Sequence, residues 1–306
     1  MKAKKQKETR KNKQSVFTVI LLVFLIAYVV TLFGLLIWGI MTAFKNYNLD
    51  YALPDDPNHY GLPRSITEYF SFFFNKFYMP VKGNTEKASI FKIILNSLLY
   101  AGGSAFFKTL IPCITAYACA RFNFKLGKII YTCIILAMII PVVGSLPSEM
   151  RVARSLGLMN SIPGIWVMKA NMLGLYFLVM YNAFKAMPNE YVEAAKIDGA
   201  NNFQVLGRIG LPIISTTFGT VFLLNFVEYW NDYQTPLVYL LDHPTMGFTL
   251  YALHYGQYLP QGLAEYAKVT PFVISFAFML IIPTLILFLI SHKKLMSNVT
   301  VGGLKG

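Results

Sequence analysis

The residues best suited to binding another molecule lie between positions 186 and 212. Charged and small residues alternate in this segment, namely Glu193, Ala194, Ala195, Lys196, Asp198, Gly199 and Ala200. Small side chains let a partner approach closely, and charged side chains can form ion pairs across an interface. The pattern suits docking of another protein better than catalysis. An amphipathic helix resting on lipid is the alternative interpretation of the same residues.

Motifs for nucleotide, metal or nucleophile chemistry are absent from the sequence. It has no G-x-x-x-x-G-K-[ST] phosphate loop, no H-E-x-x-H, no C-x-x-C and no G-x-S-x-G. The four His residues are scattered without the spacing of metal ligands, and the three Cys residues fall within apolar runs. We therefore expect no catalytic residue, no metal site and no cofactor bound by this chain.

Three polar residues interrupt long apolar runs. Asn96, Lys108 and Asn225 could line a passage for a hydroxyl-rich solute, or each could join its helix to a neighbouring one. Lys108 stands 13 residues before Arg121. In a helix this separation is about 20 Å, which is too far for the ammonium to reach a membrane surface easily.

The composition is that of a membrane protein. The 306 residues are 56% hydrophobic and 13% charged, whereas soluble domains are about 45–50% apolar and about 25% charged. Disorder requires low hydrophobicity and is excluded. The net charge of +13 suits either a bilayer or a nucleic acid. Nucleic acid is disfavoured because the basic N-terminus lacks interleaved aromatic residues and adjoins an apolar run.

Six apolar runs are long enough to cross a bilayer, which takes about 20 residues as a helix. They predict an all-α polytopic membrane protein with six transmembrane helices. The predicted spans are Ser15–Phe44, Ile93–Ala120, Ile129–Ser148, Ile165–Phe184, Ile209–Val227 and Val269–His292. The corresponding domain boundaries are a basic N-terminal tail over 1–14, a six-helix transmembrane domain over 15–292 and a C-terminal tail over 293–306.

Basic residues orient these spans. Seven of the first 13 residues are Lys or Arg, which places the N-terminus in the cytoplasm. Six spans then place the C-terminus and the segment 186–212 on the cytoplasmic side as well. The segments 46–90 and 228–268 become outer loops, and we expect residues 242–265 to form a structured part of the second.

Local signals predict a short helix-turn-helix in the segment 186–212. Pro188 suits the first turn of a helix, and Gly199 can adopt the left-handed conformation that ends it. Asn201 is a good N-cap for a second helix, with Gln204 at the capping-box position, and Pro212 marks the exit.

This segment resembles a known family motif. Glu193-Ala194-Ala195, then Asp198-Gly199-Ala200, then Ile209 before Leu211-Pro212 is similar to the EAA loop of binding-protein-dependent ABC-transporter permeases. Other short motifs resemble carbohydrate permeases related to the maltose-transporter inner subunit. They are Asn96-Ser97-Leu98, Ala116-Tyr117-Ala118 before Arg121-Phe122, Gly157-Leu158-Met159-Asn160, Trp230-Asn231-Asp232 and the terminal run from Thr300 to Gly306. Thr216 and Gly303 depart from the family pattern, which often has Pro and Ala there.

The resemblance implies a subunit of a bacterial cell-membrane importer for a sugar or oligosaccharide. Its partners would be a homologous second permease, two ATPase subunits that use ATP and Mg, and an extracytoplasmic solute-binding protein. The residues implied in docking to the ATPases are Glu193, Ala194, Ala195, Asp198, Gly199, Ala200, Ile209, Leu211 and Pro212. Those implied to approach the ATPases from the C-terminal tail are Gly302, Gly303, Lys305 and Gly306.

Two other functions compete with sugar import. EAA-type loops also occur in ABC permeases for peptides and other solutes, so a non-sugar solute is the first alternative. A membrane enzyme or an autonomous channel is the second. The lack of catalytic clusters and the EAA spacing both disfavour it.

Overall fold

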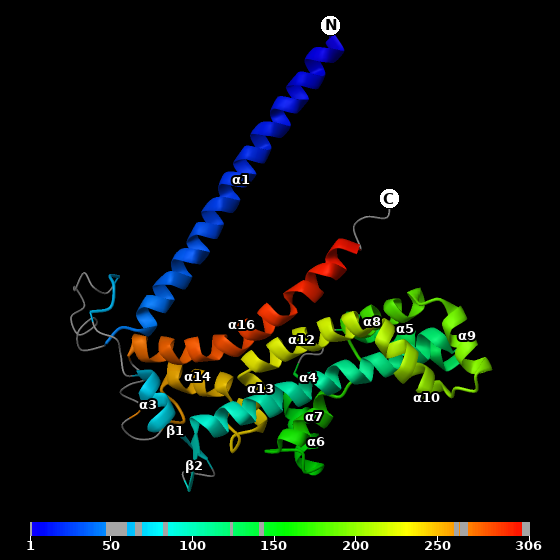
Figure 1. The fold of residues 1–306 in the computed structure, drawn as a ribbon. Helices are drawn as coiled ribbons and strands as arrows, with labels where there is room; N and C mark the ends of the chain where they lie inside the picture. Colours follow the sequence, from blue (N-terminus) through cyan, green and yellow to red (C-terminus); the bar gives the residue numbers. More distant parts are fainter. Residues whose placement is uncertain are drawn as a thin grey trace. The chain divides into compact units, whose positions relative to one another are not determined.

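Helices make up nearly all of the described structure, a computed structural model (Figure 1). It describes residues 2–46, 60–64, 69–81, 85–122, 125–140, 144–259, 263 and 269–301, with side chains between 16 and 291. Two compact units are present. The smaller comprises residues 1–70 and 269–278, and the larger comprises residues 71–268 and 279–306.

The smaller unit is built on helix α1 (Lys2–Ala43), which continues through the predicted N-terminal tail. Its segment Val16–Ala43 has 28 residues and is long and apolar enough to cross a membrane. Near its end, the carbonyl of Ala43 accepts a hydrogen bond of 2.5 Å from Ser275 Oγ of helix α16 (Thr270–Val301). The rings of Tyr69 and Phe272 pack edge to face, with centroids 5.3 Å apart.

Helix α4 (Ile90–Arg121) is the centre of the larger unit. It packs against α12 (Ser215–Asn231), α8 (Leu175–Ala186) and α7 (Ile162–Lys169), as Figure 1 shows. Hydrogen bonds join these helices as well as apolar contacts. Asn225 Nδ2 of α12 donates to Thr109 Oγ1 of α4 over 3.0 Å. Helix α4 is thereby held on three sides.

Short elements gather around the first turns of α4. Strands β1 (Tyr78–Val81) and β2 (Glu86–Ser89) form an antiparallel hairpin that leads directly into it, with Tyr78 opposite Ser89. The predicted structured outer loop contains helix α14 (Met246–Tyr255), which ends at Gly256 with φ +65°. The other short helices are α3 (Tyr69–Asn75), α6 (Leu146–Ser155) and α13 (Gln234–Tyr239).

Three described helices are long and apolar enough to be spans, namely Val16–Ala43, Ile90–Arg121 and Thr270–Ser291. A fourth candidate is bent by 79° between Asn202–Ile213 and Ser215–Asn231. The predicted third span, Ile129–Ser148, overlaps helix α5 (Lys125–Ile139), which has 15 residues, begins four residues earlier and ends before Ser148. Among the described residues, length and composition therefore support three of the six predicted spans as helices, and a fourth if the bent pair is one span.

The predicted fourth span, Ile165–Phe184, is not one continuous helix. Helix α7 ends at Lys169 and α8 begins at Leu175, so residues 170–174 are non-helical. Gly174 has φ +122°, a conformation that a side chain would strain. In a membrane, non-helical backbone is tolerated where it is buried in protein or lines a polar cavity. The break therefore points to a polar environment beside this segment.

Two adjacent glycines of α4 offer a matched test of its packing. A Cβ at Gly103 would lie 2.1 Å from the indole of Trp166, whereas a Cβ at Gly102 would meet nothing within 4 Å. The indole Nε1 donates to the carbonyl of Leu99 over 2.9 Å. We expect Gly103→Ala to displace this ring and to destabilise the protein by about 1–3 kcal/mol, as overpacking does.

The measurement is the thermal unfolding midpoint of the detergent-solubilised protein. Gly102→Ala is the control and should leave the midpoint unchanged or raise it, because Ala is favoured over Gly in helices by about 1 kcal/mol. Equal midpoints for the two variants would contradict the packing described.

Candidate functional site

The segment 186–212 forms the predicted helix-turn-helix. Helix α9 (Asn189–Ile197) follows Pro188 and is followed by Gly199 with φ +81°. Helix α10 (Asn202–Val205) begins with a capping box, in which Asn201 Oδ1 accepts from the Gln204 N–H over 2.8 Å. In return, Gln204 Oε1 accepts from the Asn201 N–H over 2.8 Å. The left-handed glycine and the capping box are both confirmed.

A wider turn leads from this motif into α12. Residues Leu206–Gly210 form the π-helix η2, and α11 (Leu211–Ile213) follows before the chain bends at Ile214. Pro212 is exposed next to the bend, and Ile209 and Leu211 are half-buried. Because a π-turn inserts an extra residue, it changes which side chains face the neighbouring helices.

One side of the motif packs against the protein. Val192, Ala195, Ala200 and Leu211 contact a buried cluster that contains Tyr117 of α4, Phe184 of α8, Val205 and Leu206. Ala195 and Ala200, implied in docking by the family resemblance, therefore also attach the motif to the larger unit. Their small side chains allow α9 to approach α4 and α8.

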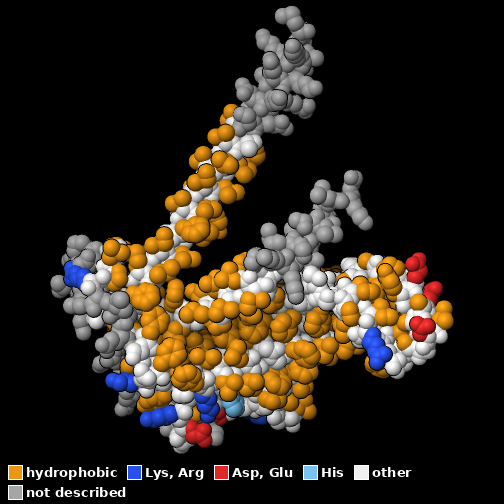
Figure 2. Space-filling view, in the orientation of Figure 1, with side chains coloured by type: hydrophobic (Ala, Val, Ile, Leu, Met, Phe, Trp, Pro, Cys, Tyr) orange, Lys and Arg blue, Asp and Glu red, His pale blue; other side chains and the backbone are white. Residues whose placement is uncertain are grey.

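The opposite side of the motif is exposed. It presents Glu193, Ala194, Asp198 and Gly199 together with Ile197 and Phe203, which are 86% and 83% exposed. We call these six residues the docking face. Figure 2 shows acidic side chains gathered at this end of the larger unit. Sequence patterning did not single out Ile197 or Phe203, because an apolar residue in a short amphipathic helix reads as a core residue.

Arg121 holds this motif against the helices behind it. Its guanidinium stands at the last residue of α4 and donates to the carbonyl of Phe184 over 2.6 Å. It also donates to the carbonyl of Met187 and to Asn189 Oδ1 at the start of α9. One side chain therefore joins the end of α4, the end of α8 and the first residue of α9. Sequence reasoning used Arg121 as a marker of the membrane boundary and as part of a family motif, and it missed this role.

The four C-terminal residues implied to approach an ATPase, Gly302, Gly303, Lys305 and Gly306, lie outside the described residues.

A polar cavity of about 500 Å³ lies beside the break between α7 and α8. Its lining includes Lys108, Lys169, Asn171, Glu228, Tyr229 and Asp232, and we call it the lysine cavity. Lys108 Nζ donates to Asn171 Oδ1 over 3.0 Å, and Lys169 Nζ lies 5.7 Å from the centroid of the Tyr229 ring. The non-helical segment thus contributes a side chain to a polar cavity.

The other two residues considered for a solute pathway lie elsewhere. Asn96 is buried, and its Nδ2 donates to the carbonyl of Pro244 over 3.1 Å, just before α14. Asn225 is buried and bonded to Thr109. Both residues join separate parts of the larger unit, and neither lines the lysine cavity.

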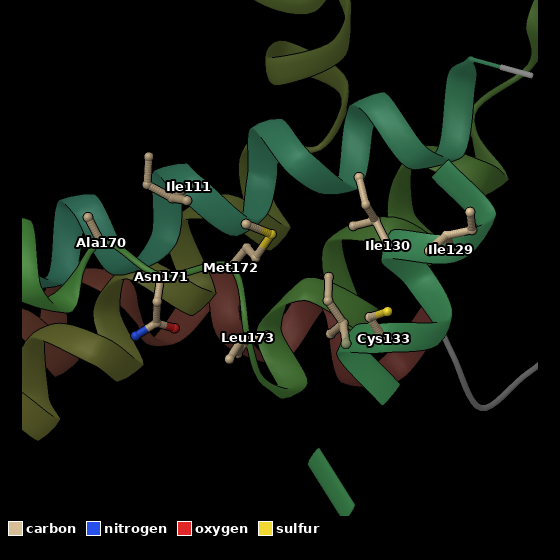
Figure 3. A pocket seen from close by; sticks show the side chains of 9 residues that line it. Ile111, Ile129, Ile130, Cys133, Ala170, Asn171, Met172 and Leu173 are labelled. Atoms are coloured by element: carbon tan, nitrogen blue, oxygen red, sulfur yellow. The ribbon is translucent and has the colours of Figure 1, made fainter. Parts of the chain in front are cut away.

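A second hollow, of about 440 Å³, opens on the other side of the broken segment. Figure 3 shows Ile111 of α4, Ile129 and Cys133 of α5, and the residues from Ala170 to Leu173 around it. Most of these side chains are aliphatic, so the hollow offers little to a hydroxyl-rich solute. Residues 170–174 thus contribute to an apolar hollow as well as to the polar cavity, and Asn171 lines both.

Asn160 and Asp232, which belong to two motifs identified in the sequence, each hold a loop in place through hydrogen bonds. Asn160 has φ +56°, its N–H donates to the carbonyl of Tyr239 over 2.7 Å, and its Oδ1 accepts from the Asp242 N–H over 2.9 Å. Asp232 Oδ1 accepts from the N–H of Gln234 over 2.8 Å, at the start of α13. These contacts fix the loops that border α7 and the lysine cavity.

Residues 109–293 match the family described as binding-protein-dependent transport system inner membrane component. The match includes α9, the docking face and most of α4's second half. The chain belongs to this family. It is therefore a transport permease subunit, and the helix-turn-helix with its Glu-Ala-Ala and Asp-Gly-Ala runs is part of the family region.

Two relatives and one solved structure illustrate what this permease resembles. It is 28% identical to the melibiose/raffinose/stachyose import permease of Bacillus subtilis (strain 168), over 72% of this chain and 78% of the relative. It is 30% identical to the sulfoquinovosyl glycerol permease of Agrobacterium fabrum (strain C58 / ATCC 33970), over 70% and 73%. A bacterial ABC transporter that imports the acidic polysaccharide alginate has the same fold, with TM-score 0.72 and 18% identity over 91% of this permease and 96% of that chain.

Arg121 generates a prediction about the mobility of α9. Hydrogen bonds from a charged donor contribute about 1.5–3 kcal/mol each. We expect Arg121→Met to raise amide hydrogen exchange in α9 and at the end of α8 about tenfold or more. Arg121→Lys should be intermediate, because an ammonium cannot reproduce the planar fork of a guanidinium.

The matched control is Lys125→Met, which removes an exposed positive charge at the start of α5. It should leave the exchange of α9 unchanged. Identical amide hydrogen exchange in the Arg121→Met and unmodified proteins would show that the Arg121 side chain does not hold α9.

Proposed function

We propose that this permease is one membrane half of an ATP-driven importer for a saccharide, delivered by an extracytoplasmic solute-binding protein. The observation that carries the proposal is the similarity to the melibiose/raffinose/stachyose import permease over 72% of the chain. The sulfoquinovosyl glycerol permease adds a second relative that handles a sugar derivative. A homologous second permease would complete the pathway.

The proposed topology has six membrane crossings in the bacterial cell membrane, with both termini in the cytoplasm. The third and fourth crossings each combine shorter elements, α5 with the residues after it and α7 with α8. The basic N-terminus and the basic residues Arg121, Lys125 and Lys128 support a cytoplasmic location for the end of α4. The docking face then faces the cytoplasm too, on the side where ATPase subunits bind.

Two ATPase subunits, which use ATP and Mg, would supply the energy. The docking face supports this role because it combines exposed apolar anchors with charged neighbours. Ile197 and Phe203 can insert into a cleft, while Glu193 and Asp198 can pair with basic residues at its rim. Gly302, Gly303, Lys305 and Gly306 are proposed to lie near the same ATPases.

Movement of the docking face would reach the pathway through α4. Closure of the ATPases displaces α9, and Arg121 and the contacts of Ala195 transmit the displacement to α4 and α8. Lys108 lies on α4 and Glu228 on α12, so the walls of the lysine cavity move with these helices. The opening of the cavity then alternates between the two sides of the membrane.

Gly199 allows docking to be tested without breaking the turn. Asn and Asp have the same shape, and both tolerate the left-handed conformation that Gly199 adopts. We expect Gly199→Asp to reduce copurification of the ATPases and solute uptake about tenfold or more, because it adds an unpaired negative charge to the interface. Gly199→Asn is the control and should retain most of both. Wild-type assembly and uptake by Gly199→Asp would exclude the docking role.

The solute class is tested through the binding protein encoded beside this permease. The purified protein is screened by calorimetry against saccharides and peptides, and uptake of its ligand is then measured in cells that express the complete importer. We expect a saccharide to bind and to be taken up only when this permease is present. A peptide ligand would overturn the sugar assignment and leave the family membership intact.

A further inference from the structure

The charged side chains around the lysine cavity differ in their hydrogen bonds and in their exposure to solvent. Asp232 is fully engaged, because its Oδ2 accepts from Tyr100 Oη over 2.7 Å and its Oδ1 accepts from the N–H groups of Gln234 and Thr235. Glu228 is exposed at the rim. The two lysines, in contrast, are half-buried in the wall. Two lysines and two carboxylates therefore line the cavity, and of the carboxylates Asp232 is the one held by hydrogen bonds.

Neither lysine has a carboxylate partner. Among the described residues, no carboxylate oxygen lies within 4.0 Å of the ammonium of Lys108 or Lys169. Lys108 has the amide oxygen of Asn171, and Lys169 has the face of the Tyr229 ring. Two charged groups act on Lys108 electrostatically, because the ammonium of Lys169 repels it and the carboxylate of Glu228 attracts it from beyond ion-pair distance. Unpaired like charges in a membrane protein are costly, and an anion between them would relieve that cost.

The backbone beside these lysines is unusually open. Within the described part of the chain, the N–H groups of Met172 and Leu173 donate to no main-chain carbonyl. Broken membrane helices commonly mark the solute site of a transporter, since their free backbone groups can bind polar solutes. The break lies directly between Lys169 and α8, and Asn171 within it contacts Lys108. Asn171 of this segment and both lysines thus meet in one cavity, while Met172 and Leu173 line the apolar hollow.

We propose that the lysine cavity is a subsite for an anionic group of the transported saccharide, a carboxylate, sulfonate or phosphate. The inference rests on the proposed function and narrows its substrate class to acidic saccharides. Lys108 and Lys169 bind the oxyanion from two helices, α4 and α7, while Asn171 holds Lys108 in place. Glu228 at the rim repels a second anion, so the neutral hydroxyl-rich part of the saccharide is favoured there.

The first measurement is the charge of the ligand bound by the solute-binding protein. The screen contains matched probes, trigalacturonate and the neutral galactotriose, together with sulfated and phosphorylated sugars. Binding of acidic saccharides in preference to the neutral probe is expected. A neutral saccharide ligand would overturn the anionic subsite while leaving saccharide import standing, and a peptide ligand would overturn both.

The second measurement is uptake of that ligand by importers that carry Lys108→Met, Lys169→Met or Lys108→Arg. We expect each Met variant to raise the KM for uptake about tenfold or more, because one charged contact to the anion is lost. Lys108→Arg keeps the charge and should retain most of the uptake. Lys92→Met, at an exposed position on α4 away from the cavity, is the control and should behave as the unmodified protein.

Copurification of the ATPases with each variant separates transport from folding. Among the described residues, Lys169 makes no side-chain hydrogen bond that folding could depend on. Lys169→Met therefore tests the proposal even if Lys108→Met fails to assemble. Unchanged KM in assembled Lys169→Met would overturn the proposal. A raised KM in both assembled Met variants, together with a nearly unchanged KM in Lys108→Arg, would support it.

Discussion

Hydrocarbon offers no hydrogen bonds to a peptide group, so a chain that crosses a bilayer must satisfy its backbone internally or keep it next to polar groups. Helix α4 meets this requirement over 32 residues without interruption. The segment 170–174 does not, and it lies where Lys108, Asn171 and Tyr229 provide a polar surrounding. The position of the break and the position of the cavity are two consequences of the same constraint.

Helix α4 connects the two functional regions of the larger unit. Its last residue, Arg121, bonds to the carbonyls of Phe184 and Met187 and to Asn189, and therefore holds α9. Further along the same helix, Lys108 lies in the wall of the cavity. A rigid helix transmits a displacement along its length, whereas a flexible loop would absorb it. Interhelical contacts such as Asn225 with Thr109 let α12 move with α4.

The helix-turn-helix has one side packed against the protein and one side exposed. Ala195 and Ala200 face the buried cluster around Tyr117 and Phe184, while Ile197 and Phe203 remain exposed. Contact between water and exposed apolar side chains of this size is unfavourable, and a partner protein would remove that contact. The acidic residues beside them place negative charge on this surface next to the apolar side chains.

Local chemistry is what the sequence determined by itself. Gly199 ends a helix and Asn201 with Gln204 begins the next because these effects involve residues at most four positions apart. The membrane class and the family motif also followed from the sequence, since hydropathy and fixed spacing need no tertiary contact. Only the tertiary structure decided that the fourth predicted span is broken, that Asn225 bonds to Thr109 and that Arg121 reaches Asn189. Those contacts join residues far apart in the chain, and no local pattern encodes which distant partner a lysine, an arginine or an asparagine meets once the helices have packed.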